Sequence, residues 1–131
     1  MGTPPRNDVC KVLISGVVGT EPKEIYLKNG HYVINFALAV VGHFKAIHNQ
    51  EFHKPAETMW LSVEMWDSFA KENYANIKKG VAIQAVGYII LNKWIDKMNG
   101  EERKMYKTRV TKLLTKEECT SMQAILGVIT G

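Results

Sequence analysis

Four large aromatic side chains stand among polar or basic neighbours in this sequence: Phe44, Trp60, Trp66 and Trp94. Unpaired nucleobases stack on exposed aromatic faces for about 1–3 kcal/mol each, whatever the base, while nearby cations follow the phosphate backbone. Each ring alone has a structural alternative, because a tryptophan can equally be half-buried against a loop or a second subunit. Their common setting indicates a surface on which the bases of single-stranded nucleic acid stack.

Lysine and arginine accompany these rings. Between Arg103 and Lys116 six residues are Lys or Arg and none is Asp or Glu. Cations on a curved sheet neutralise phosphates and release counterions, which gives an affinity that is independent of base sequence and sensitive to salt. The alternative is a solvated strand face, and a net charge of +4 is too small to decide between the two. The phosphate-binding candidates are Lys45, Lys93, Lys97, Arg103, Lys107 and Arg109.

The other polar clusters predict neither catalysis nor a metal site. His43, His48 and His53 are spaced five apart with no cysteine nearby, so we expect polar loop residues that contact phosphate at most. No nucleophile–base arrangement and no carboxylate pair at useful spacing stands out, so we expect no enzyme activity and no cofactor. Glu64, between two tryptophans, would repel phosphate; the alternatives are that it meets base edges or a lysine.

The chain has 131 residues, 46% hydrophobic and 23% charged, which is the size and balance of one globular domain. Cys10 and Cys119 stand near opposite ends, which excludes a disulfide scaffold, and the longest apolar run is too short to span a membrane. We expect three parts: residues 1–8 as a flexible lead-in, 9–114 as the binding domain and 115–131 as a short helix or tail.

Alternation of apolar and polar residues predicts long strands at 9–18, 32–41, 58–66, 81–95 and 103–114, with a short extended piece at 24–27. Asn29-Gly30 and Asn99-Gly100 predict hairpin turns, and Gly87 a bend or bulge. Helical spacing follows at 67–77, with Asp67 or Ser68 as cap, and Thr115 and Glu118 form a capping box. This order predicts a mainly β fold: a five-stranded Greek-key OB barrel with one helix between strands three and four and a short C-terminal helix.

Over residues 8–114 the chain resembles the bacterial and mitochondrial type of single-stranded DNA-binding protein. The order and spacing of several short segments carry the resemblance: VLISGVVGTEP at 12–22, NG at 29–30, NFALA at 35–39, ETMWLSV at 57–63, IKKGV at 77–81, VG at 86–87, NKW at 92–94 and NG at 99–100. The resemblance implies an OB fold without ATP or metal, usually a homotetramer, that coats and protects single strands in replication, repair and recombination. It places the four stacking aromatics of that family on Phe44, Trp60, Trp66 and Trp94.

The sequence departs from that family in two places. Leu61 stands where bacterial members carry a subunit-bridging histidine, and the last residues, AILGVITG at 124–131, are neither acidic nor rich in Gly, Pro or Gln. We therefore expect no acidic tip that recruits replication or repair proteins, and an organelle, the mitochondrion, rather than a bacterial cytoplasm or a mobile element. Two other functions stay open: an RNA-binding OB module of an organellar RNA-processing complex, and a primosome-like adaptor whose aromatics pack on protein.

Overall fold

The computed structural model describes residues 8, 10–42 and 57–126 of the chain. Its strands are β1 (Lys11–Val18), β2 (Lys23–Tyr26), β3 (Tyr32–Gly42), β4 (Glu57–Trp66), β5 (Ala82–Ile95) and β6 (Glu102–Leu114). Helix α1 (Asp67–Asn73), a 3₁₀ turn (Tyr74–Asn76) and helix α2 (Lys116–Ile125) complete the described elements. Residues 1–7 of the predicted lead-in and the histidine-containing stretch, with Phe44 and Lys45, lie outside the described residues.

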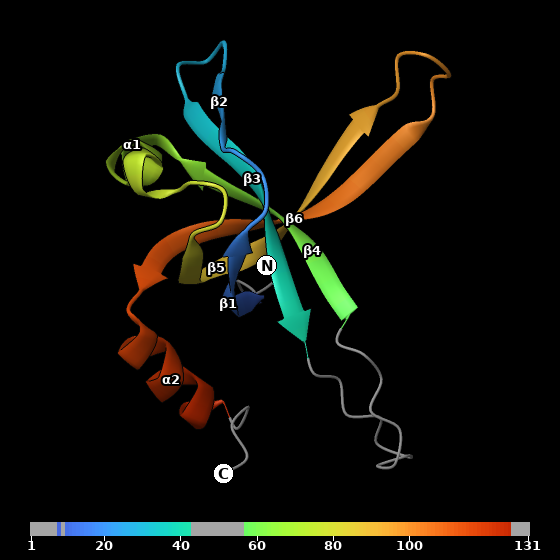
Figure 1. Ribbon diagram of the computed structural model, residues 1–131. Helices are drawn as coiled ribbons and strands as arrows, with labels where there is room; N and C mark the ends of the chain where they lie inside the picture. The colour runs from blue at the N-terminus through green and yellow to red at the C-terminus, as the bar shows by residue number, and fades with distance from the viewer. Residues whose placement is uncertain (1–7, 9, 43–56, 127–131) are drawn as a thin grey trace, which may run out of the picture.

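Five strands close into a barrel, and the sixth is appended to it (Figure 1). The sheet runs in the order β1-β5-β6-β4-β3-β2, and an additional pairing of β1 with β3 closes the ring. All neighbours are antiparallel except β4 and β6, which pair in parallel at Val63 and Glu64. The predicted five-stranded barrel is confirmed, and the short extended piece is a further strand, because it pairs with β3 across the predicted Asn29-Gly30 turn.

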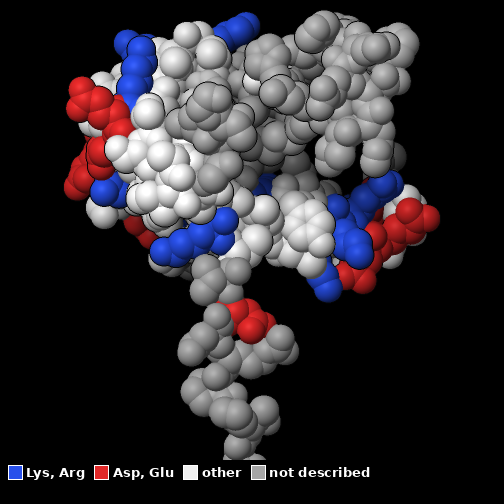
Figure 2. Space-filling view, turned by 90° about the horizontal axis from the view of Figure 1, so that it is seen from below, with Lys and Arg blue, Asp and Glu red and all other residues white. Residues whose placement is uncertain are grey.

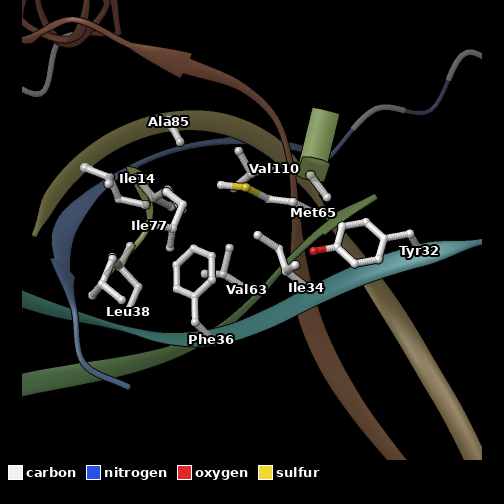
Figure 3. Packing of buried hydrophobic residues seen from close by; sticks show 13 residues of the cluster. Ile14, Tyr32, Ile34, Phe36, Leu38, Val63, Met65, Ile77, Ala85 and Val110 are labelled. Carbon is white, nitrogen blue, oxygen red and sulfur yellow. The ribbon is translucent and has the colours of Figure 1, made fainter. Parts of the chain in front are cut away.

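The barrel interior is filled by alternate side chains of its strands (Figure 3). Ile34 and Leu38 of β3 and Val63 and Met65 of β4 are fully buried. The predicted inward face of β4 is therefore correct at its second half, whereas Met59 near its start is exposed. Alternation along β4 points every second residue, counted from Trp60, to the outside of the barrel. Trp60 and Trp66 therefore share the outer side of the barrel wall.

The two helices differ in how they begin. Thr115 and Glu118 form the predicted capping box of α2, which packs against β1, β5 and β6. The predicted cap of α1, Asp67 or Ser68, is wrong: Trp66 is the cap residue and no side chain caps the helix. Asp67 has a positive φ of 53°, and its carboxylate accepts a hydrogen bond from Tyr32 N instead. Among the described residues no helix is long and apolar enough to cross a bilayer.

Strands β5 and β6 continue beyond the barrel as a two-stranded arm, which Figure 1 shows reaching away from the other strands. The predicted bulge occurs between Val86 and Gly87, where the register with β6 shifts. A side chain at Gly87 would not fit, because a Cβ there would lie 2.1 Å from the carbonyl oxygen of Arg109. The missing side chain lets β6 approach β5 closely where the arm leaves the barrel.

Candidate nucleic-acid interface

Strand register places most of the predicted contact residues on one outer face. Directly paired residues point to the same side of a sheet, and alternate residues along a strand share a side. Glu64 of β4 is opposite Arg109 of β6, and Arg103 of β6 is opposite Trp94 of β5. Six predicted residues therefore share this side, which we call the aromatic face: Trp60, Trp66, Trp94, Arg103, Lys107 and Arg109.

Trp60 is supported from below by main chain. Its ring lies against Gly19, where an added Cβ would come within 2.3 Å of Trp60 Cζ3. The corner that holds Gly19 is tied to β3, because Gly19 N donates to Ala37 O at 2.8 Å and Ala37 N donates to Thr20 Oγ1 at 2.9 Å. Trp60 is nevertheless 61% exposed. The result is a ring with a firm backing and a large open surface, which is what stacking requires.

Trp94 occupies the arm. It is 44% exposed and directly opposite Arg103. Arg103 Nε donates to Asp96 Oδ2 at 3.0 Å, so this guanidinium is bridged to a carboxylate on the arm itself. Ion pairs as exposed as this one hold their partners weakly, typically by 0–1 kcal/mol, and Arg103 can exchange Asp96 for a phosphate at little cost.

Trp66 is held more tightly than the other two rings. Arg109 Cζ lies 4.3 Å from the Trp66 ring centroid, and Arg109 Nε donates to Glu64 Oε1 at 2.8 Å. Glu64 is 5% exposed and Arg109 is half-buried. The His31 ring meets Trp66 edge-on, with centroids 5.4 Å apart. The sequence suggested base edges or a lysine as the partner of Glu64, whereas in the structure its carboxylate pairs with Arg109.

Electrostatics in this cluster favour the charged forms. Burial, the strongest single influence, lowers the pKa of Arg109, but its hydrogen bonds to Glu64 and Tyr88 and the Glu64 charge outweigh that influence and raise the pKa overall. Close by, the hydrogen bond from Tyr32 N, followed by the one to His31, lowers the pKa of Asp67. The raised pKa keeps the Arg109 guanidinium charged where it donates to the Glu64 carboxylate.

The remaining predicted cations are dispersed. Lys93 is opposite Lys104 on the other side of the arm, and its Nζ is 3.9 Å from Glu102 Oε1. Lys97 is exposed in the turn between β5 and β6, and Lys107 is half-buried on the aromatic face. Figure 2 shows Lys and Arg interleaved with Asp and Glu rather than gathered into one basic field. The structure thus brings Lys107 to the rings but not Lys93.

Candidate metal ligands and thiols in the described part of the chain do not form a cluster. No group of three or more His, Cys, Asp or Glu is placed there to hold a metal ion. Cys10 is an exposed free thiol, and Cys119 is a buried one on α2.

With this geometry in place, the chain can be compared with known proteins. The sequence model of the Single-strand binding protein family matches residues 9–115. The chain belongs to this family. The match confirms the family resemblance seen in the sequence.

Two known proteins show how similar individual relatives are. Single-stranded DNA-binding protein 1 of Chlorobaculum tepidum is 27% identical over 115 residues, which cover 88% of this chain and 64% of that protein. A solved structure, the Plasmodium falciparum SSB complex with ssDNA, superposes with a TM-score of 0.69 at 18% identity over 86% of this chain and 100% of that one. The superposition confirms the fold class.

Two features of this family member were not predicted from its sequence. The contact between Gly19 and Trp60, in which the missing side chain of Gly19 makes room for the ring, was not among the predictions. Arg109 was assigned to phosphate, and its pairing with Glu64 was missed. The sequence did contain a sign of this pairing, because Glu64 lies on the same side of its strand as Trp60 and Trp66. A carboxylate there would repel phosphates unless a cation on a neighbouring strand neutralised it.

Gly19→Ala tests the support under Trp60. The added methyl group overlaps the ring, so we expect this family member to bind oligo-dT more weakly, by up to the roughly 1–3 kcal/mol of one stacked base. A fluorescence titration measures the affinity. In a Trp60→Ala background the same methyl group should cost nothing more; a loss of equal size in both backgrounds would show that Gly19 acts elsewhere.

Proposed function

We propose that the protein binds single-stranded DNA without base preference, by stacking bases on its aromatic face while lysine and arginine neutralise phosphates. The observation that carries the proposal is the pair of open rings, Trp60 and Trp94, on the same side of one sheet as Lys107 and Arg103. Stacking on such rings is tolerant of sequence because every base has an aromatic face. Membership of the single-strand binding family supports the same conclusion.

We further propose that the protein acts as a homo-oligomer, a tetramer, that protects single strands in replication, repair and recombination. Apolar side chains exposed on the other side of the arm, such as Ile89, Leu91 and Tyr106, support an association between copies. Light scattering of the purified protein gives the number of copies. The mitochondrial location stays a prediction, which imaging of the tagged full-length protein tests.

A titration of the whole chain with oligo-dT tests the binding proposal. We expect tryptophan fluorescence to fall as bases cover the rings, and a duplex of equal length to bind far more weakly. Raising the salt concentration should weaken binding. The logarithm of the association constant should fall linearly with the logarithm of the salt concentration, with a slope of about −0.7 per phosphate neutralised on a single strand. Unchanged fluorescence with oligo-dT would contradict the proposal.

Competition between poly-dT and poly-U compares DNA with RNA in the same assay. Preference for poly-U would replace DNA by RNA as the ligand, since the 2′-hydroxyl is the group that separates the two. Failure to bind either strand, with capture of a protein partner, would favour the adaptor function instead.

A further inference from the structure

Arg109 differs from the other cations of the aromatic face because its charge and its flat side are both engaged. Glu64 accepts its Nε–H at 2.8 Å, and the Trp66 ring covers its guanidinium with 4.3 Å between Cζ and the ring centroid. The Tyr88 ring lies further off, at 5.9 Å. Arg103 also donates its Nε to a carboxylate, but its side chain is 50% exposed, against 28% for Arg109, so its N–H groups can turn to a phosphate. Arg109 lacks that freedom.

The orientation of the Trp66 ring depends on these contacts. Its Nε1 is buried and has no hydrogen-bond partner among the residues that the structure describes. The ring is therefore aligned by its face against Arg109 and by its T-shaped contact with the His31 ring, rather than by its N–H group. A guanidinium stacked on an indole is a favourable arrangement, and more so where water is excluded.

We propose that Arg109 is a positioning residue: held by Glu64, it fixes the Trp66 ring for base stacking and does not itself neutralise a phosphate. The inference rests on the proposed binding of single-stranded DNA. It also gives a role to Glu64, which lies on the same side of β4 as the two tryptophans. Glu64 anchors the guanidinium, and its negative charge is cancelled within the pair. Gly87 contributes from β5 by letting the main chain of Arg109 come close.

The double variant E64Q/R109Q tests this role, because it replaces the ion pair by a neutral pair of similar shape and leaves the net charge unchanged. Neutral replacement of both partners also avoids an unpaired buried charge. We expect oligo-dT affinity to fall about three- to tenfold, part of what one stacked base contributes, with the salt slope unchanged. R109K should lose as much, because an ammonium keeps the charge but has no flat side. The double variant K112Q/E118Q is the matched control, because it neutralises another ion pair, the exposed one between β6 and α2, without changing the net charge.

Three results would overturn the proposal: a salt slope reduced by about 0.7, which marks a lost phosphate contact; full affinity in R109K; or full affinity in E64Q/R109Q. A double-mutant cycle separates positioning from general stability, because E64Q/R109Q should cost nothing further in a Trp66→Ala background. A wild-type chain that does not bind oligo-dT would refute the proposed function itself, which is a different outcome from any of these.

A second measurement does not require the Trp66→Ala chain to fold. In a Trp60→Phe/Trp94→Phe background Trp66 is the single tryptophan, because the chain has three, and its emission can be excited selectively over that of tyrosine. We expect E64Q/R109Q to shift its emission to longer wavelength as the ring leaves its guanidinium cover and meets water. Emission that stays at its wild-type wavelength shows that Arg109 does not hold the ring.

Discussion

The double variant Trp60→Ala/Trp94→Ala should bind oligo-dT about 2–6 kcal/mol more weakly than the wild type, the sum of two stacking contacts. Both rings are open to solvent, Trp60 on its glycine backing and Trp94 on the arm, so both can be covered by bases. Because neither ring belongs to the buried core, the barrel itself should remain folded. Fluorescence anisotropy of labelled oligo-dT measures the loss, since the variant has fewer tryptophans to quench.

Tyr106→Ala is the matched control for this variant. Tyr106 is 68% exposed and also lies on β6, but alternation places it on the opposite side of the arm from Arg103 and Trp94. Its loss should leave DNA affinity within about twofold, compared at a protein concentration where light scattering gives the variant and the wild type the same number of copies. If Tyr106→Ala weakens binding as much as the double variant does, the strand runs over the other side of the arm and the aromatic face is wrongly assigned.

Leu38→Ala should lower the free energy of unfolding by about 2–5 kcal/mol, the range found when a buried leucine leaves a cavity. Leu38 is fully buried in the cluster that Figure 3 shows, at the level of β3 where β1 and β4 both pair with it. Its loss therefore weakens the point at which the barrel closes. Urea or guanidinium unfolding measures the change.

Val41→Ala on the same strand is the control, because Val41 is 58% exposed and its truncation should change the unfolding free energy by less than about 0.5 kcal/mol. DNA binding offers a second comparison. Under conditions where the Leu38→Ala chain is still folded, its affinity for oligo-dT should match the wild type, since Leu38 faces the interior and not the DNA. An equal cost for both substitutions would mean that the interior is not organised as the structure has it.

Local patterns in the sequence were sufficient to predict the strands and the side of β4 on which Trp60 and Trp66 lie. Alternation in β4 separates Val63 and Met65 from Trp60 and Trp66, and these sides are the observed ones. Turn residues marked both hairpins, and Gly87 marked the bulge. The helix start was predicted wrongly, because the Asp67 carboxylate prefers the main chain of Tyr32, a residue from another element. Short-range rules do not include such a competitor.

The order of elements and the outward tryptophans were thus determined by the sequence itself, since period-two alternation acts within a strand. The identity of neighbouring strands was decided only by the tertiary structure. The β1–β3 pairing and the parallel β4–β6 pairing close the barrel. This closure places Glu64 beside Arg109 and packs Gly19 against the Trp60 ring. These pairs are 45 and 41 residues apart, so their contact depends on packing of the whole barrel. For that reason Arg109 looked like one more phosphate ligand in the sequence, and its partner appears only in the fold.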